Sequence, residues 1–278
     1  MKRAALTCIY LLISLCGSAQ YLNMSEIPGI HSLHPFFLNQ QTPIQLALNY
    51  HAAGQQIADQ TKQLSILGET RLPTNKLKLL VGGQYTHAKL GINQQSMFLL
   101  PLGYSLKINE NQSLTPFTSI GFSGNSVNLQ EAYLSDANDP ELQHNTLQTQ
   151  TFNYGFGLNY HRKLISGGIS YHHAASGGIS KVFSTRWQVN HNLTNDFRLI
   201  NQVAYQQFQS GKRWQLWAGI EYSERLTIGL LKGSLETIGL SLSTTIHQQL
   251  VLSYQITQPT IQWLGAAHTL QIKYIPKP

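Results

Sequence analysis

Eleven histidines are the first residues to test for chemistry, because a neutral imidazole is a frequent ligand of transition metals. His172 and His173 are adjacent, so on a β-strand their side chains point to opposite faces and cannot share one ion. His31 and His34 are close enough to meet in a turn, but no carboxylate or cysteine stands between or beside them. The spacing therefore predicts no histidine metal site.

Serine, glycine and carboxylate residues give no better pattern for catalysis. No Gly-x-Ser-x-Gly nucleophile elbow occurs. Glu221 and Glu224 flank a predicted turn beside Arg225, which we interpret as an ion pair within that turn. Three glycine pairs precede neither a helix nor a Gly-Lys-Ser/Thr run, so they predict turns or strand kinks instead of phosphate loops: Gly82-Gly83, Gly167-Gly168 and Gly177-Gly178. We predict no catalytic residue, no cofactor and no enzyme, and keep a lipid hydrolase or acyltransferase as a disfavoured alternative.

The composition is unusual for a water-soluble protein. Hydrophobic residues make up 42% but charged residues only 11%, where roughly 25% charged is typical. Gln, Asn, Ser, Thr and Tyr supply the polar surface instead, and a wall in contact with lipid excludes charge because its desolvation is costly. The net charge of +7 comes from scattered residues, including Lys2 and Arg3, so no nucleic-acid partner is expected.

The first 19 residues have the pattern of a secretory signal peptide. Lys2 and Arg3 precede an apolar stretch from Ala4 to Leu15, and Gly17-Ser18-Ala19 offers small residues for cleavage before Gln20. Lipidation at Cys16 is the alternative. A lipoprotein signal requires a small residue directly before the cysteine, and Leu15 occupies that position. Both cysteines lie in this segment, so residues 20–278 would contain no thiol.

The rest of the chain follows a period of two residues, with no apolar run of the ~18 residues that a membrane-spanning helix needs. Between Thr151 and His161, one face takes the aromatic and apolar residues and the other takes Asn, Gly and His. The same alternation recurs with short turns between the runs. It predicts about 14 antiparallel strands, at 44–51, 64–71, 77–86, 95–108, 113–124, 151–161, 163–172, 181–191, 196–208, 213–222, 224–232, 236–247, 249–257 and 266–275.

Two features favour a membrane barrel over a soluble β-sandwich. The inward residues are mostly small and polar, so they could not fill a sandwich core. Aromatic residues also recur near the predicted strand ends, at the depth where lipid headgroups would lie: Tyr50, Tyr85, Tyr160, Tyr171, Trp214, Tyr222 and Tyr274. We therefore predict that residues 20–278 form one all-β, antiparallel transmembrane β-barrel in a bacterial outer membrane.

One long polar segment, Asn125–Gln150, interrupts the strands. It contains four acidic residues and a proline, and a loop of this length in a barrel usually carries function or enters the lumen. We predict that it binds a partner protein, and a solvated connector is the alternative. The candidate contact residues are Glu131, Asp136, Asp139, Pro140 and Glu141.

Several motifs resemble the PorP/SprF family of the type IX secretion system of Bacteroidetes. An acidic segment ending in Asp-Pro leads into a Gly-rich aromatic strand, and a second strand, a closing hairpin and a final strand follow in order. These motifs are Tyr133–Pro140, Phe152–Tyr160, Gly168–His172, Ile238–Ser241, Leu252–Tyr254 and Ala267–Tyr274. The family's opening Asn-Pro-Ala-Tyr-like segment is matched only by the proline and one aromatic in His34-Pro35-Phe36-Phe37.

The resemblance implies an outer-membrane component that helps to secrete cargo proteins or anchor them at the surface. Its implied partners are outer-membrane lipid, the cargo, and periplasmic and outer-membrane components of the same system. It brings no catalytic residues. A passive channel or a transporter for a small or apolar ligand stays open as an alternative, because the inward residues are polar.

Overall fold

The chain folds into fourteen antiparallel β-strands. The computed structural model describes residues 44–53, 61–73, 78–90, 93–128, 146–174, 181–208, 211–234, 237–246, 249–258 and 266–274. The strands are β1 Ile44–Ala53, β2 Thr61–Pro73, β3 Lys78–Leu90, β4 Asn93–Asn109, β5 Gln112–Asn128, β6 Thr146–Arg162, β7 Ile165–Ala174, β8 Lys181–Asn192, β9 Phe197–Phe208, β10 Gly211–Tyr222, β11 Leu226–Gly233, β12 Ile238–Ile246, β13 Leu250–Gln258 and β14 Ala267–Tyr274. Each matches one predicted run, so the all-β class and the strand number are confirmed. The described residues include no helix that could span a membrane.

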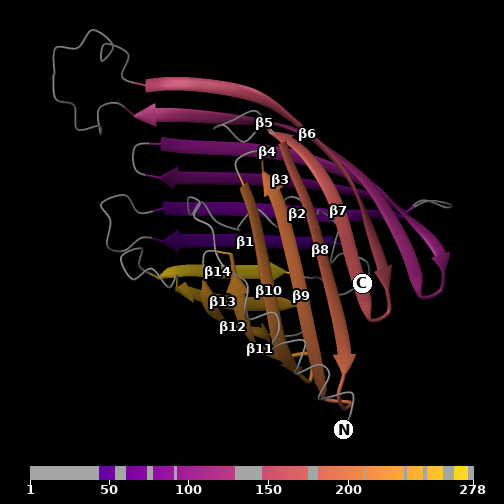
Figure 1. Cartoon of the computed structure of the whole chain (residues 1–278). Coiled ribbons are helices and arrows are strands. Elements are labelled where there is room, and N and C mark those ends of the chain that lie inside the picture. Colours follow the sequence, from indigo (N-terminus) through magenta and orange to yellow (C-terminus); the bar gives the residue numbers. More distant parts are fainter. Residues whose placement is uncertain are drawn as a thin grey trace.

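Each strand pairs with its neighbours in sequence, and β14 pairs with β1 to close a barrel (Figure 1). Closure leaves no strand edge unpaired. A sheet in hydrocarbon requires this, because lipid cannot form hydrogen bonds with backbone N–H and C=O groups. Side chains on the lumen face reinforce the closing pair. Gln271 Nε2 donates to Asn49 Oδ1 at 2.6 Å, and His51 Nδ1 lies 2.8 Å from Thr269 Oγ1.

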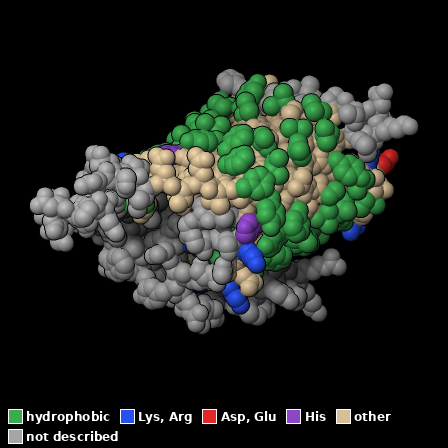
Figure 2. Space-filling model, turned by 90° about the horizontal axis from the view of Figure 1, so that it is seen from above, with side chains coloured by type: hydrophobic (Ala, Val, Ile, Leu, Met, Phe, Trp, Pro, Cys, Tyr) green, Lys and Arg blue, Asp and Glu red, His purple; other side chains and the backbone are tan. Residues whose placement is uncertain are grey.

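The barrel reverses the inside and outside of a soluble protein. Large apolar side chains of the strands point outward and stay exposed, as Phe156 at 57% and Leu240 at 56% illustrate. Figure 2 shows a broad patch of hydrophobic side chains on the face of the barrel drawn there. In the part of the chain that the structure describes, all sixteen buried polar or charged residues point inward instead, at the alternate strand positions. Apolar residues outside and polar residues inside are the arrangement that a barrel with lipid around it and a polar interior requires.

The predicted faces are confirmed by this burial pattern. Phe156 and Leu240 face outward, whereas Asn159, 1% exposed, and Ser243 face the lumen. The expectation that inward residues are small was wrong in part. The lumen also holds large side chains, and Leu80 at 2% and Phe117 at 5% pack together there. Phe117 fits because Gly157 on the neighbouring strand has no side chain beneath its ring.

Aromatic residues mark both ends of the outward band, as predicted, with one exception. Tyr160, Tyr222 and Tyr274 lie at one end of the barrel, and Tyr50, Tyr171 and Trp214 lie near the other end. Tyr85 also faces outward, but it lies in the middle of β3 and not near its end. Tyr and Trp prefer the headgroup layer because one part of the ring is apolar and the rest is wet.

The two rims of the barrel differ in the length of their connections. At one rim the turns are short: Glu110 and Asn111 alone join β4 to β5, and Lys163 and Leu164 join β6 to β7. At the other rim the connections include those from Ala53 to Thr61, from Asn128 to Thr146 and from Gln258 to Ala267. Short turns of outer-membrane barrels face the periplasm, and long connections face the exterior. We therefore call them the periplasmic rim and the surface rim.

Candidate functional site: the lumen and the two rims

The lumen is most tightly packed along strands β5 to β8. Thr115, Ser119 and Asn159 are each 1% exposed there, and Ser184 is fully buried. Hydrogen bonds connect neighbouring strands within this wall, for example from Ser123 Oγ to Asn153 Oδ1 at 3.3 Å. The inward side chains of this wall are therefore closely covered within the described part of the barrel.

Charged residues from opposite walls lie within electrostatic range of one another inside the barrel. Lys273 on β14 lies within electrostatic range of Glu69 on β2 and of Arg186 on β8. In the closed strand order, β8 stands seven strands from β1, which is the opposite wall. Arg186 is 4% exposed and Glu69 is 5% exposed, so this cluster is enclosed. A buried charge is tolerated only when opposite charge and hydrogen bonds compensate its lost hydration.

The wall formed by β10 to β14 is less tightly covered. Many of its inward residues are half-buried, among them Trp217, Ser241, Ser253 and Gln271, although Leu231 is 4% exposed. Ser243 Oγ and Ser253 Oγ lie 2.8 Å apart across the β12–β13 pair. The interior is thus dense on one side and partly accessible on the other.

The turns of the periplasmic rim are fastened to one another. Arg198 at the start of β9 reaches Glu224 Oε1 at 3.0 Å and Glu221 Oε1 at 3.4 Å. The Ser223 amide donates to the Asp196 carbonyl oxygen at 2.7 Å, which joins the β8–β9 turn to the β10–β11 turn. The sequence prediction was therefore wrong about the cation: Glu221 and Glu224 pair with Arg198 from a neighbouring strand and not with Arg225.

Two more backbone hydrogen bonds connect turns of the periplasmic rim to neighbouring strands. The Asn190 amide on β8 donates to the Leu164 carbonyl of the β6–β7 turn at 2.8 Å. The Thr245 amide on β12 donates to the Arg225 carbonyl of the β10–β11 turn at 2.7 Å. Consecutive turns from β6 to β12 thus form one connected surface.

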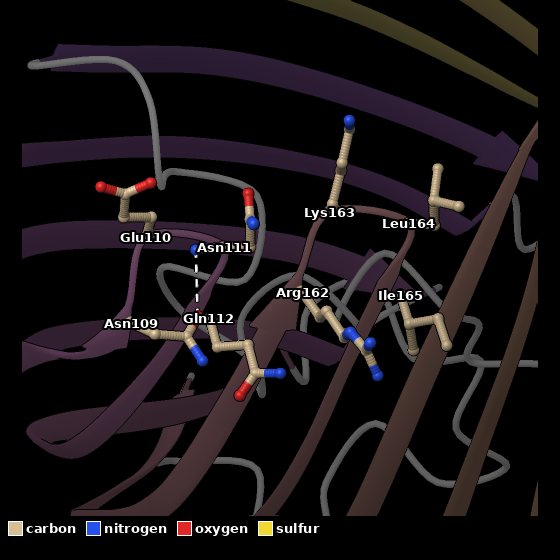
Figure 3. A pocket seen from close by; sticks show the side chains of 8 residues that line it. All are labelled: Asn109, Glu110, Asn111, Gln112, Arg162, Lys163, Leu164 and Ile165. Atoms are coloured by element: carbon tan, nitrogen blue, oxygen red, sulfur yellow. Dashed lines mark hydrogen bonds between the residues drawn. The ribbon is translucent and has the colours of Figure 1, made fainter.

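A hollow of about 570 Å³ lies at this rim between the β4–β5 and β6–β7 turns (Figure 3). The Asn111 amide donates to Asn109 Oδ1 at 3.0 Å, which fixes the first turn. The hollow offers two cations, one carboxylate, several amides and two aliphatic side chains. Its lining residues are Asn109, Glu110, Asn111, Gln112, Arg162, Lys163, Leu164 and Ile165.

The predicted partner-binding segment starts and ends at the surface rim. The boundaries Asn125 and Gln150 were too wide, because β5 continues to Asn128 and β6 begins at Thr146. These extra residues pair strand to strand, which their polar composition concealed. The candidate residues Glu131, Asp136, Asp139, Pro140 and Glu141 lie outside the described residues.

The histidines occupy the positions that the strand period requires. His172 is 5% exposed in the lumen, whereas His173 points outward beside Tyr154, with ring centroids 5.1 Å apart. His31 and His34 lie outside the described residues. Within the described ranges, no three His, Cys, Asp or Glu residues come together as a metal site would need.

Sequence reasoning missed the enclosed charges and the rim pairings. Glu69, Arg186 and Lys273 stand at inward positions of alternating strands, so their parity alone indicates a lumen location. Whether these three charges come near one another depends on the distance between the two opposite walls of the barrel, which the parity does not give. Arg198 and Glu221 are direct cross-strand partners, which only the register reveals.

Solved structures with the same architecture are outer-membrane barrels. The outer membrane protein Omp33 of Acinetobacter baumannii has a TM-score of 0.54 at 5% identity, over 85% of this chain and 99% of that one. The CymD monoaromatic hydrocarbon channel has a TM-score of 0.50 at 13% identity, over 95% of each chain. At such low identity these likenesses show the fold alone. No curated protein matches the chain.

The family comparison is specific and covers nearly the whole chain. The model of the type IX secretion system membrane protein PorP/SprF matches residues 20–274. The match includes every strand of the barrel, from Ile44 in β1 to Tyr274 in β14. The chain is thus an outer-membrane β-barrel that belongs to the PorP/SprF family of type IX secretion system membrane proteins.

Proposed function

We propose that this barrel is a non-enzymatic part of the type IX secretion system, which works through protein contacts at its two rims. One observation carries the proposal: the inward side chains along β5 to β8 are buried, including the long, charged Arg186 at 4% exposure. A folded or extended cargo chain would have to displace these side chains to pass. Contacts at the rims need no such displacement.

The periplasmic rim supplies a preformed surface for a periplasmic partner. Its turns are connected by the Arg198–Glu221 and Arg198–Glu224 contacts and by backbone hydrogen bonds between neighbouring turns. A surface whose turns are already ordered loses little conformational entropy when a partner binds. Both signs of charge are present there, which favours a partner of complementary pattern over a uniformly charged one.

The surface rim carries the segment between Asn128 and Thr146, which faces the cell exterior under the orientation assigned from connection lengths. The partner of this segment is then a secreted cargo protein or another surface component, not a periplasmic one. The acidic residues Glu131, Asp136, Asp139 and Glu141 would meet a basic surface, and Pro140 would hold the preceding backbone extended.

A passive channel for a small ligand is the second candidate. It is favoured by the half-buried inward residues of β10 to β14, such as Ser241 and Gln271, beside which water has access. One structure of the same fold is named as a monoaromatic hydrocarbon channel. Such a path would be confined to one side of the lumen and would suit a small solute rather than a polypeptide.

Affinity copurification from the native outer membrane tests the proposal. The tagged wild-type barrel is expected to bring down other components of the secretion system together with cargo. In parallel, the purified barrel in planar bilayers is expected to show no steady conductance, and no turnover of phospholipid. Conductance without copurified partners would favour the channel, and lipid turnover would favour an enzyme.

A further inference from the structure

The hollow at the periplasmic rim contains two basic side chains that are not paired with an acid. Within the described ranges, the ion pairs of this rim belong to Arg198, which contacts Glu221 and Glu224. The side chains of Arg162 and Lys163 are exposed, and in the same ranges they take part in no ion pair and no hydrogen bond. Both cations are therefore available to a negatively charged ligand.

The side chains that line the hollow fall into two groups (Figure 3). Gln112 and Arg162 point the same way from neighbouring strands, and Ile165 follows them in one row across β5, β6 and β7. Glu110 and Lys163 extend from the turns in the opposite direction, so the Glu110 carboxylate points away from the Arg162 guanidinium. Because Glu110 is the acidic residue of the lining, the side around Arg162 offers N–H donors from a guanidinium and an amide beside no carboxylate of the hollow.

Exposed aliphatic side chains lie beside these donors. Leu164 is 40% exposed in the β6–β7 turn, and Ile165 is 36% exposed at the start of β7. Leu164 belongs to a turn and not to a strand, so the alternation that directs apolar residues toward lipid does not account for its exposure. A partner side chain that covers Leu164 gains the free energy of burying apolar surface.

Both turns that form the hollow are held in place. In the β4–β5 turn, the Asn111 amide donates to Asn109 Oδ1 at 3.0 Å. In the β6–β7 turn, the Leu164 carbonyl oxygen accepts a hydrogen bond of 2.8 Å from the Asn190 amide on β8. A ligand therefore meets walls that are already ordered, which lowers the conformational entropy lost on binding.

A protein segment fits this combination better than a lipid phosphate does. A phosphate at headgroup depth could reach Arg162, which stands on the outer face at the end of β6. It would leave Lys163 and Leu164 uncovered, because both belong to the turn beyond the strand ends. An extended peptide can place one carboxylate on Arg162, a second on Lys163 and an aliphatic side chain on Leu164.

We propose that this hollow binds an acidic segment of a periplasmic partner, whose carboxylates pair with Arg162 and Lys163 while an aliphatic side chain covers Leu164. A guanidinium and a carboxylate form two parallel hydrogen bonds, which fixes the direction of the bound segment. The inference rests on the proposed function, because it names the chemistry of the partner that docks at the periplasmic rim.

Binding of labelled synthetic peptides to the mature barrel in nanodiscs of neutral phospholipid tests this proposal. The probe is acetyl-Gly-Asp-Leu-Asp-Gly-amide, and the comparison peptide has Asn at both Asp positions. An exposed ion pair contributes up to about 5-fold in affinity, so two pairs should give the Asp peptide an advantage of about 10-fold on wild type. R162Q/K163Q should lose this advantage, and R162E/K163E should prefer a third peptide with Lys at both positions.

Two controls separate the hollow from the rest of the periplasmic rim. K78Q/R225Q removes two exposed basic residues of this rim that do not line the hollow, and it should stay within about 2-fold of wild type. Leu164→Asn should weaken binding of the Asp peptide, whereas Leu193→Asn, at a position 59% exposed in the β8–β9 turn, should not. Heat-modifiable migration on a gel checks that every variant is folded.

Several results would overturn the proposal. Equal binding of the Asp and Asn peptides by wild type, or unchanged binding by R162Q/K163Q, would remove the cations from the site. Displacement of the Asp peptide by phosphatidylglycerol would mean that the hollow holds a lipid headgroup. A wild-type dimer that R162E/K163E dissociates, seen by mass photometry, would assign the hollow to a second copy of the chain.

Copurification from the native outer membrane separates this inference from the proposed function. Secretion-system components should copurify with wild type and be reduced with R162E/K163E. Their absence from the wild-type sample would defeat the proposed function. Equal recovery with wild type and R162E/K163E would defeat only the assignment of the partner to this hollow.

Discussion

The Trp217 indole N–H on β10 donates a hydrogen bond of 2.7 Å to Ser241 Oγ on β12, across the intervening strand β11. The ring lies flat against the lumen wall because Gly229 on β11 and Gly219 on β10 have no side chains beneath it. A Cβ built on Gly229 would lie 2.5 Å from two indole carbons, and one on Gly219 would lie 2.3 Å from another. One aromatic side chain thus fastens three strands of the less tightly covered wall.

Gly229→Ala is expected to lower the free energy of unfolding by about 1–3 kcal/mol, because the indole must leave the wall and its bond to Ser241. Urea unfolding in lipid vesicles, followed by Trp fluorescence, measures this change. Gly83→Ala on β3 is the matched control, since nothing lies within 4 Å of a Cβ at that position. A similar loss in both variants would mean that strand glycines matter for backbone reasons and not for the Trp217 contact.

Leu242 and Ser243 test the assignment of the two faces. They are neighbours in the middle of β12, and Leu242 is 49% exposed on the outer face while Ser243 faces the lumen. Leu242→Arg should cost roughly 2–4 kcal/mol of stability at the bilayer midplane, and Ser243→Arg much less. Equal costs, measured by unfolding in vesicles, would contradict the outward and inward assignment.

The β10–β11 turn allows two opposing effects to be compared. Ser223 and Glu224 have φ angles of 48° and 57°, a left-handed conformation that glycine adopts without strain. Glu224 is 81% exposed in its contact with Arg198, and an exposed ion pair contributes only about 0.2–1 kcal/mol. Glu224→Gly should therefore change the free energy of unfolding by less than about 1 kcal/mol.

Glu224→Val removes the same charge but adds a branched side chain, and it should lower stability by about 1–3 kcal/mol. Equal loss in Glu224→Gly and Glu224→Val, measured by the same vesicle unfolding, would show that the ion pair outweighs the backbone strain.

The period of two residues was sufficient to predict the barrel and both faces of its strands. Phe156 and Asn159 lie on the predicted faces because register leaves a strand residue only two choices once one face meets lipid. The ends of β5 and β6 were missed, since Ser126, Asn128 and Thr146 are polar although they stand at outward positions, so the alternation of apolar outward residues is lost there.

The contacts within the site depend on distances that one sequence does not contain. The pairing of Arg198 with Glu221 follows from the register between β9 and β10, which aligns residues far apart in the chain. The approach of Arg186 to Lys273 depends on the cross-section of the barrel. The large inward residues Phe117 and Trp217 fit only because Gly157 and Gly229 lie beneath their rings on the neighbouring strands.

Gln20 is expected to be the first residue of the mature protein, because Gly17-Ser18-Ala19 suits a signal peptidase and Leu15 does not suit lipidation at Cys16. Intact mass spectrometry of the barrel purified from outer membrane measures the N-terminus directly. A diacylglyceryl group on Cys16 would disprove this prediction.

The acidic residues of the surface connection can be tested without shortening the chain. Replacing Glu131, Asp136, Asp139 and Glu141 by Gln or Asn should weaken binding of a basic partner and reduce its sensitivity to salt. The measurement is copurification at low and high ionic strength. Partner recovery that is unchanged at both salt concentrations would remove these four residues from the interface.

The most direct test of contact-based function is to replace residues 129–145 by a two-residue turn. Barrel stability comes from closed strand pairing, so the variant should keep heat-modifiable migration on a gel. An equally shortened connection between Gln258 and Ala267 is the control at the same rim. Surface display of cargo should be lost in the first variant and retained in the second. Wild-type display by a folded barrel that lacks residues 129–145 would contradict the account.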